Sequence, residues 1–332
     1  MIVTKTSYRL SLAGGGSDYP SFFLNNPNGG IVITSTINKY CYIFARYLPP
    51  FFEHKNRIVY SRIELPQTFD EINHPSVKNC LKFMCIQQGV EIHHAGDLPA
   101  RSGIGSSSAF TVGLLNALHI LKGKQIDKYE LALEAIHVEQ DLICEKVGSQ
   151  DQCAVSIGGF NYIKFGNHKP KVQQLNITEE RIKKLESCLM LVFTGFPHMA
   201  SEIAKTYNFK ERESEIKEIM ELTKDTYKIL TCGEILDYGQ ILKETWNLKK
   251  KLSKSISSSY LDFLNNEAIK YGATSCRIIG AGGGGFMLIF CTPDKQITLR
   301  NSDTFKNMLF VPFRFETDRE NCGSRIISAN GD

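Results

Sequence analysis

A glycine- and serine-rich segment that leads directly into an apolar stretch constrains the fold of this chain more than any other feature. Residues 99–109 read Pro-Ala-Arg-Ser-Gly-Ile-Gly-Ser-Ser-Ser-Ala, and the stretch Ser108–Leu121 is apolar on almost every side of a helix. A helix with this pattern must be buried, so it belongs at the centre of a layered domain. The start of this helix is suited to bind a ligand rather than to be buried. Glycines let a ligand approach the backbone, and the first backbone N–H groups of a helix attract anions.

The composition indicates an ordinary globular protein. The chain has 332 residues, enough for two domains, with 42% hydrophobic and 22% charged residues. Its net charge of +4 is too small to indicate a nucleic-acid partner, and its apolar stretches are too short to cross a membrane. The ten cysteines are scattered without a Cys-x-x-Cys pair. This pattern favours reduced thiols and a cytoplasmic location over a secreted disulfide framework.

The order of predicted elements indicates an α+β protein with two domains, residues 1–175 and 176–332, divided within a polar and basic segment. The first domain is expected to contain two strands within 30–48 that meet near Ile37–Lys39, a strand at 91–95, the buried helix, a second helix from Asp127 to about Lys146, and a hairpin over 153–165. The second is expected to form an antiparallel sheet with helices on one face. Its expected elements are a strand at Leu189–Phe193, long charged helices to about Tyr271, strands on both sides of Gly280–Gly285, another helix and a strand near Phe310–Phe315.

Three glycine clusters, at Gly14–Gly16, Gly103–Gly105 and Gly280–Gly285, each lie beside a predicted element. The middle cluster is the most informative, because its N–H groups can hold phosphate and its serine hydroxyls can ligate Mg²⁺, which prefers oxygen. The alternative is a serine N-cap after a flexible turn. The chain has no Walker motif, and the third cluster precedes a predicted strand rather than the helix of a dinucleotide site. Hydride transfer is therefore disfavoured.

Two carboxylates follow the buried helix. Glu139 is the one polar member of a row on the second predicted helix. The other members are Ala132, Ala135, Ile136, Leu142 and Ile143. Because an unpaired buried carboxylate is costly, Glu139 needs either a buried salt bridge or a metal ion such as Mg²⁺. Asp151 is expected on a loop ahead of a strand, where it is either a catalytic group or a turn-forming residue.

Taken together, these segments resemble the GHMP kinases, named for galactokinase, homoserine kinase, mevalonate kinase and phosphomevalonate kinase. Arg9–Tyr19 is similar to the first family motif, Gly103–Ser108 to the phosphate loop, and Ile279–Phe286 to the third motif. The 12 positions from Glu139 to Asp151 match the spacing of the magnesium-binding Glu and catalytic Asp of the family's sugar kinases. The resemblance implies a ribosomal protein S5-like N-terminal domain and a ferredoxin-like C-terminal domain, with ATP bound between them.

The resemblance also implies roles for the matching residues, with ATP and Mg²⁺ as cofactors. Asp151 would orient the acceptor hydroxyl and accept its proton, and Arg9 would lie beside it near the γ-phosphate. Ser107 and Glu139 would hold Mg²⁺. The residues expected to bind ATP are Gly103, Ile104, Gly105, Ser106, Ser107 and Ser108. The residues expected to bind the sugar are Gly15, Gly16, Ser17, Asp18 and Gly283.

Within the family, Leu-Ala-Gly-Gly-Gly-Ser-Asp is closer to the heptose and fucose kinases than to the galactokinases. Local features such as Gly148-Ser-Gln-Asp-Gln and Trp246-x-Leu-Lys resemble the heptose 7-phosphate kinases. The implied reaction is ATP-dependent phosphorylation of the anomeric hydroxyl of a heptose 7-phosphate, giving the 1,7-bisphosphate, in nucleotide-activated heptose biosynthesis for surface polysaccharide. The alternatives are a fucose or hexose 1-kinase, or a non-catalytic sugar sensor on the same fold.

The residues that would bind the distal phosphate of the sugar are less defined. Arg101, Lys146 and His198 are candidates, and each is otherwise a solvated surface charge. The cluster Lys249–Lys251 is interpreted as the solvated face of a helix. The expected partner is a small-molecule sugar phosphate, and neither a nucleic-acid nor a membrane partner is expected. Whether the chain forms a homo-oligomer is left open.

Overall fold

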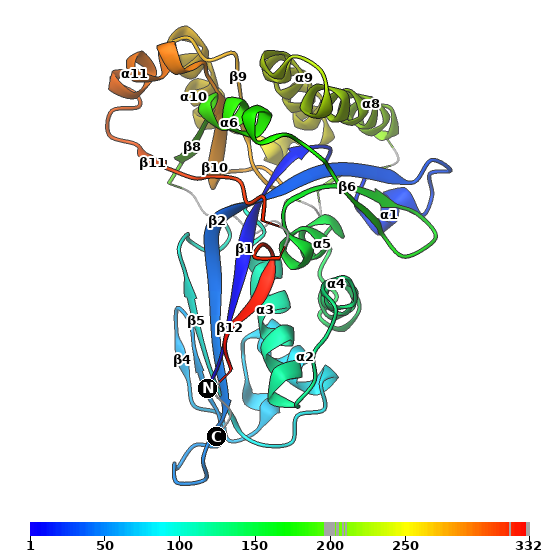
Figure 1. Ribbon diagram of the computed structural model, residues 1–332, viewed down its shortest axis with the longest axis vertical. Coiled ribbons are helices and arrows are strands. Elements are labelled where there is room, and N and C mark those ends of the chain that lie inside the picture. The colour runs from blue at the N-terminus through cyan, green and yellow to red at the C-terminus, as the bar shows by residue number, and fades with distance from the viewer. Residues whose placement is uncertain (196–202, 204–205, 208, 210, 319, 330–332) are drawn as a thin grey trace.

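Two long antiparallel strands, β1 (Ile2–Ala13) and β2 (Gly30–Tyr47), form the axis of the protein (Figure 1). The structure is a computed structural model that describes residues 1–195, 203, 206–207, 209, 211–318 and 320–329. The two strands are rich in β-branched and aromatic residues, which suit a pleated and largely buried surface. Almost all of the first half of the chain is arranged around them.

An eight-stranded sheet extends from this pair in the order β12-β1-β2-β5-β3-β4, with β6 and β7 branching from β2. Its other strands are β3 (Arg57–Val59), β4 (Ile63–Glu64), β5 (Val90–Gly96), β6 (Phe160–Phe165), β7 (Lys171–Gln174) and β12 (Ser324–Ala329). Strand β2 pairs with β6 through residues 30–35 and with β5 through residues 41–47. The prediction of two strands that meet near Ile37–Lys39 is therefore wrong. The chain continues through this segment as one strand, with a register shift against β1, and exchanges one partner strand for another.

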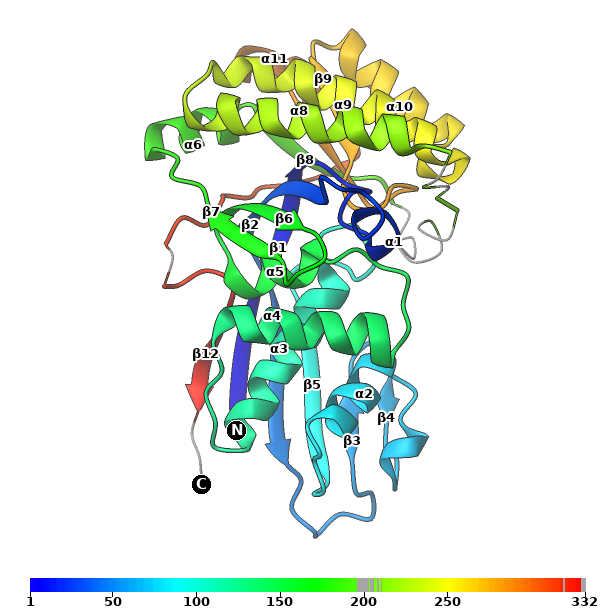
Figure 2. The same ribbon diagram turned by 90° about the vertical axis from the view of Figure 1, so that its right-hand side faces the viewer.

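Helices cover one face of this sheet (Figure 2). They are α2 (Pro75–Phe83), α3 (Ser106–Leu121), α4 (Lys128–His137) and α5 (Gln150–Ile157), and a short α1 (Pro20–Phe23) and η1 (Phe69–Glu71) lie in the connections. Helix α3 packs on β1, β2 and β12, with α2, α4 and α5 around it. Every residue from Ser108 to Leu118 is buried, which confirms the predicted central helix.

Two local predictions in this layer are wrong. The second helix does not run to Lys146, because α4 is followed by a turn of π-helix, η2 (Val138–Leu142). The wider turn rotates the following residues off the buried face, so Leu142 is 40% exposed. The expected hairpin over 153–165 is a helix, α5, followed by the single strand β6. The small residues of α5 fit closely between α3, α4 and β1, so packing overrides local strand propensity.

The second half of the chain forms an antiparallel sheet of four strands in the order β11-β8-β10-β9. These strands are β8 (Leu189–Phe193), β9 (Ser275–Ile278), β10 (Phe286–Phe290) and β11 (Leu309–Val311). The helices of this half are α6 (Glu179–Ser187), α8 (Glu213–Thr231), α9 (Tyr238–Leu252), α10 (Ser259–Lys270) and α11 (Pro293–Asn301), with short turns η3 (Ile235–Asp237) and η4 (Lys254–Ile256). Helices α8, α9 and α10 lie together as a layer over this sheet (Figure 2). The predicted α+β class and the antiparallel sheet are confirmed, and the expected last strand is shorter than predicted.

The chain ends in the sheet where it begins. Strand β12 pairs antiparallel with β1, from Ile2 with Ala329 to Thr6 with Ser324. The domain boundary at residue 175 stays a prediction. If the chain is divided there, β12 belongs to the second domain by sequence but lies in the sheet of the first domain. Among the residues that the structure describes, no helix has the length and apolar character needed to span a bilayer.

Candidate active site

Arg9 and Asp151 form a two-pronged ion pair at the centre of the protein, although they lie 142 residues apart in the chain. Arg9 Nε donates to Asp151 Oδ1 at 2.8 Å, and Nη2 donates to Oδ2 at 2.6 Å. The third nitrogen, Nη1, donates to the carbonyl of Gly103. Arg9 is 3% exposed, while a quarter of the Asp151 side chain is exposed. One edge of this carboxylate is therefore fixed by the guanidinium, and the rest of it faces solvent or a ligand.

The local structure explains how these two side chains meet. Arg9 lies on β1 next to a register shift against β2, and its backbone N–H donates to Ile104 O at 3.0 Å. Asp151 lies in the first turn of α5, not on a loop ahead of a strand as predicted. Gly105 of the glycine-rich loop packs directly on Arg9, and an added Cβ there would lie 3.0 Å from Arg9 Cγ. Its φ of +73° also favours a residue without a side chain.

The glycine-rich loop ends at the exposed start of α3. Gly105, with φ of +73°, is the residue before the first helical turn, and it has no side chain with which to cap that turn. The alternative of a serine N-cap is therefore wrong. Ser106 Oγ accepts from Arg101 N, Ser108 Oγ donates to Glu139, and Ser107 is exposed. The N–H groups of this first turn point out of the helix, as an anion-binding site requires.

Glu139 lies beneath this loop and is 1% exposed. Its Oε2 accepts hydrogen bonds from Ser108 Oγ at 3.0 Å and from Gln152 Nε2. Its Oε1 is buried and has no hydrogen-bond partner among the described residues. Burial raises the pKa of this carboxyl to about 7, against the opposing effect of the polar side chains of Gln152, Thr111 and Ser108. Among those residues Glu139 forms no ion pair, so the structure gives no support to the salt-bridge alternative.

These donors fit Mg²⁺. One buried carboxylate oxygen lacks a partner, and the serine hydroxyls of the loop are oxygen ligands as well. In the parts of the chain that the structure describes, no group of three His, Cys, Asp or Glu side chains forms a complete metal cage. This is the usual arrangement for Mg²⁺, which is held by one or two carboxylates and by the phosphates of a substrate.

The first glycine cluster folds around Asp18. The buried carboxylate of Asp18 accepts from Gly16 N at 3.0 Å and from Gln150 Nε2 at 2.9 Å. Burial, and secondarily the charge of Asp151, raises the pKa of Asp18 to about 6. Ser17 has a different role, because its buried hydroxyl donates to Ile31 O at 2.9 Å and so fixes the loop to β2. Asp18 and Asp151 are thus held close together by α5 and the loop that follows β1.

The third glycine cluster packs against the second, backbone to backbone. A Cβ added at Gly103 would lie 2.1 Å from Ile279 O, and one added at Gly285 would lie 2.4 Å from Ser102 O. Phe286 N also donates to Ser102 O at 3.1 Å. The two loops, which belong to different sheets, therefore support each other. Gly283 lies farther along this loop, where its N–H donates to Ile256 O at 2.8 Å, and its sugar-binding role stays a prediction.

We expect Gly103→Ala to destabilise the protein by about 2–4 kcal/mol, through positive-φ strain and a clash with the Ile279 carbonyl. Gly123→Ala is the matched control, because Gly123 also has a positive φ, +70°, but nothing lies within 4 Å of its added Cβ. The control should lose only about 1–2 kcal/mol in urea unfolding. Equal losses in both variants would mean that the contact between the two loops adds nothing.

The sequence analysis missed Lys249, which it assigned to a solvated helix face. Lys249 is 4% exposed, and its Nζ donates to the carbonyl of Gly280. Burial, and then the nearby Arg277 charge, lowers its pKa to about 7. The signal was present, because the residue lies on the buried stripe of α9. That stripe consists of Leu242, Thr245, Trp246, Lys249 and Leu252.

Arg277 is a second buried cation that no sequence motif indicated. It lies on β9, and its Nη2 donates to Ser11 O at 2.9 Å, while Tyr238 Oη donates to Leu12 O at 2.7 Å. These bonds attach the end of β1 to the second half of the chain. Within the described residues, the Nε and Nη1 atoms of Arg277 have no hydrogen-bond partner.

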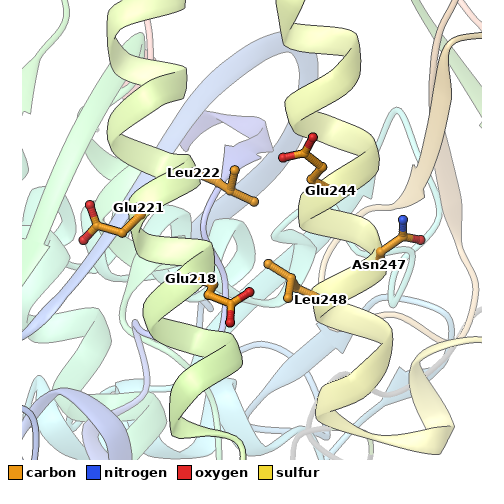
Figure 3. A pocket seen from close by; sticks show the side chains of 6 residues that line it. All are labelled: Glu218, Glu221, Leu222, Glu244, Asn247 and Leu248. Carbon is orange, nitrogen blue, oxygen red and sulfur yellow. The ribbon is translucent and has the colours of Figure 1, made fainter.

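The structure describes two of the three candidates for distal phosphate binding, and Arg101 lies beside the phosphate loop, where its N–H donates to Ser106 Oγ. Arg101 and Lys146 are exposed, and His198 lies outside the described residues. A surface hollow of about 420 Å³ lies between α8 and α9 (Figure 3). It is lined by Glu218, Glu221, Leu222, Glu244, Asn247 and Leu248. None of these is a predicted site residue, and their acidic character does not suit a phosphate.

Comparisons with known proteins agree with this geometry. Residues 75–159 match the model of the GHMP kinases N terminal domain. The chain is 30% identical to D-glycero-alpha-D-manno-heptose 7-phosphate kinase of Campylobacter jejuni over 315 residues, which cover 90% of this chain and 91% of that protein. It is also 30% identical over 214 residues to a bifunctional fucokinase/GDP-fucose pyrophosphorylase of Arabidopsis thaliana, covering 60% of this chain and 20% of that protein.

The fold is shared with a solved structure, a D-glycero-D-manno-heptose 1-phosphate kinase from Bacteroides thetaiotaomicron. The TM-score is 0.79 with 24% identity, and 99% of each chain is covered. A likeness at this identity concerns the fold, while the match to the Campylobacter protein extends over nearly the whole of both sequences. With the loop, the buried glutamate and the Arg9–Asp151 pair in place, the chain belongs to the GHMP kinases, a family of ATP-dependent phosphotransferases.

Proposed function

We propose that this chain transfers the γ-phosphoryl group of ATP, with Mg²⁺, to the anomeric hydroxyl of D-glycero-D-manno-heptose 7-phosphate, giving the 1,7-bisphosphate. The observation that carries the phosphoryl transfer is the Arg9–Asp151 pair beside the start of α3. It puts one carboxylate, partly exposed and fixed in orientation, next to a loop that suits phosphate. The similarity to the Campylobacter enzyme, over 90% of this chain and 91% of that protein, supports the acceptor.

In this proposal each residue has a task that matches its surroundings. The N–H groups of residues 103–108 bind the phosphates, and Arg9 shares the negative charge that develops during transfer. Asp151 accepts the proton of the acceptor hydroxyl with the carboxylate edge that Arg9 leaves free. Asp18 binds sugar hydroxyls. Phosphoryl transfer needs little more from a protein than this positioning and charge neutralisation.

Glu139, through its unpartnered Oε1, and Ser107 would hold Mg²⁺ in the same proposal. When bound, the ion would neutralise negative charge on the phosphates. Ser108 and Gln152 orient the Glu139 carboxylate by hydrogen bonds to its other oxygen. This leaves Oε1 as the oxygen available to the ion.

A second candidate is a fucose or hexose 1-kinase. It is favoured by the match to the Arabidopsis bifunctional fucokinase/GDP-fucose pyrophosphorylase, which covers 60% of this chain, whereas the heptose kinase match covers 90%. The names of the two heptose kinases also place the acceptor phosphate differently, at position 7 in one and position 1 in the other. Only a substrate comparison separates these acceptors.

The test is a coupled assay of ADP release with heptose 7-phosphate, mannose 6-phosphate, fucose and galactose. We expect kcat/KM to be highest for heptose 7-phosphate, with a new anomeric phosphate in the ³¹P NMR spectrum of the product. If kcat/KM is highest for fucose or galactose, the heptose 7-phosphate acceptor is wrong and the second candidate, a fucose or hexose 1-kinase, is supported. No turnover with any sugar, together with binding of one of them, would support a sensor instead of an enzyme.

A further inference from the structure

Lys249 is a buried cation that the proposed function has not used. It comes from α9 in the second half of the chain and lies between the first glycine cluster, which it meets at Gly15, and the third, which it meets at Gly280. Its ammonium has three N–H donors, of which one binds the carbonyl of Gly280. A neutral amide would suffice to satisfy one carbonyl, whereas burying a charge is costly. The charge therefore needs a reason beyond this bond.

The buried charges around Lys249 do not balance. Three cations, Arg9, Lys249 and Arg277, act electrostatically on one another, and two carboxylates, Asp18 and Asp151, lie among them. Asp151 is occupied by Arg9, and Asp18 by Gly16 and Gln150. Within the described part of the chain neither Lys249 nor Arg277 forms an ion pair. One positive charge is thus left over, so the site is complementary to an anion.

Gly15 shows where such an anion has access. This residue has φ of +112°, and the atoms nearest to an added Cβ are Nζ and Cε of Lys249, at 3.7 and 3.9 Å. No other atom outside the adjoining residues lies within 4 Å of that position. The missing side chain therefore leaves a space directly beside the ammonium. Asp18 and Gly16, which are expected to bind the sugar, belong to the same loop, so the space lies beside the expected sugar site.

We propose that Lys249, with Arg277 behind it, binds the phosphate group that the acceptor sugar already carries. This rests on the proposed function, and it assigns the distal phosphate contact for which the sequence offered Arg101, Lys146 and His198. A phosphate supplies two negative charges and several acceptor oxygens, which match the leftover charge and the free N–H groups of Lys249. Lys249 thereby makes the enzyme specific for a phosphorylated sugar.

The experiment compares Lys249→Met with Lys251→Met, a change of the same type two residues along α9, where the side chain is exposed. Binding of D-glycero-D-manno-heptose 7-phosphate and of the unphosphorylated heptose is measured by calorimetry, and kcat and KM are measured for both. We expect Lys249→Met to weaken binding of the phosphorylated sugar by roughly 10- to 100-fold, seen mainly in KM. Binding of the unphosphorylated sugar and of ATP should stay within about threefold. Lys251→Met should behave as the wild type.

Folding does not limit this test. Methionine matches the length of the lysine stem, and replacing a buried charge with an apolar group is often neutral or stabilising. Lys249→Gln is a second variant with the same expected result. If either folded variant keeps the wild-type preference for the phosphorylated sugar, or loses both sugars equally, the assignment of Lys249 is wrong. If the wild type neither binds nor phosphorylates heptose 7-phosphate, the proposed acceptor is wrong, and the phosphate contact with it.

Discussion

Replacing Asp151 with Asn is expected to lower kcat by roughly 10²- to 10⁴-fold, the usual contribution of a positioned base. The amide has nearly the shape of the carboxylate, but it cannot accept the proton of the acceptor hydroxyl. It also presents an NH₂ group to one of the two Arg9 nitrogens that donate to Asp151 at 2.6 and 2.8 Å. The phosphate loop itself is unchanged, so the dissociation constant for ATP should stay within about threefold.

The control for this change is Asp141→Asn, because Asp141 is an exposed carboxylate paired with His137 on the neighbouring turn. It should leave kcat and stability close to those of the wild type. Steady-state kinetics and ATP binding are measured for both variants, and a thermal melt checks that each is folded. Turnover of Asp151→Asn within about tenfold of the wild type would exclude Asp151 as the base.

Replacing Glu139 with Gln is expected to stabilise the metal-free protein above pH 7 while abolishing its response to Mg²⁺. The pKa of Glu139 is raised to about 7 in the folded state, against 4.5 ordinarily. The folded wild type therefore binds this proton more tightly, and its stability falls as the pH rises from 4.5 to 7. At 1.36 kcal/mol for each pKa unit, the variant should gain up to about 3 kcal/mol at pH 8 and nothing below pH 4.5.

Urea unfolding with a chelator, at pH 8 and at pH 4, measures this difference. Added Mg²⁺ with a non-hydrolysable ATP analogue should then raise the melting temperature of the wild type, and Glu139→Gln should show little of that rise. The variant should also need more Mg²⁺ for half-maximal turnover. Glu134→Gln is the control, since that carboxylate is paired with His119 and lies outside the site. An unchanged Mg²⁺ titration in Glu139→Gln would exclude it as a ligand.

The central features of the fold followed from local patterns. The apolar stretch at 108–121 predicted the buried helix α3, and the apolar residues after Gly285 predicted the strand β10, which disfavours a dinucleotide site. Both inferences depend on residues close together in the sequence, within one helix or one strand, where the spacing of apolar residues indicates the type of element. The predictions for β2 and α5 failed because each element takes its form from distant partners. Strand β2 continues through Ile37–Lys39 as it changes from β6 to β5, and α5 is a helix because of what packs around it.

For the candidate site, the sequence indicated candidate residues but not how they are connected. It indicated Glu139, because a carboxylate in an apolar helical row is visible without a structure. Lys249 interrupts such a row on α9 in the same way, but the two lysines that follow it disguised the pattern as a solvated face. Arg277 could not have been found, because the side-chain hydrogen bond that the described residues give it reaches Ser11, 266 residues away.

The sequence by itself determined the glycine loops, the central helix and the spacing of the two acids, since these depend on backbone freedom and periodicity over short distances. Tertiary structure alone decided which charges are buried together. Whether a lysine lies in water or beside Asp18 depends on how one half of the chain packs on the other. That packing places Lys249 beside the first glycine loop and Arg277 beside the end of β1, and within the described residues neither of them forms an ion pair.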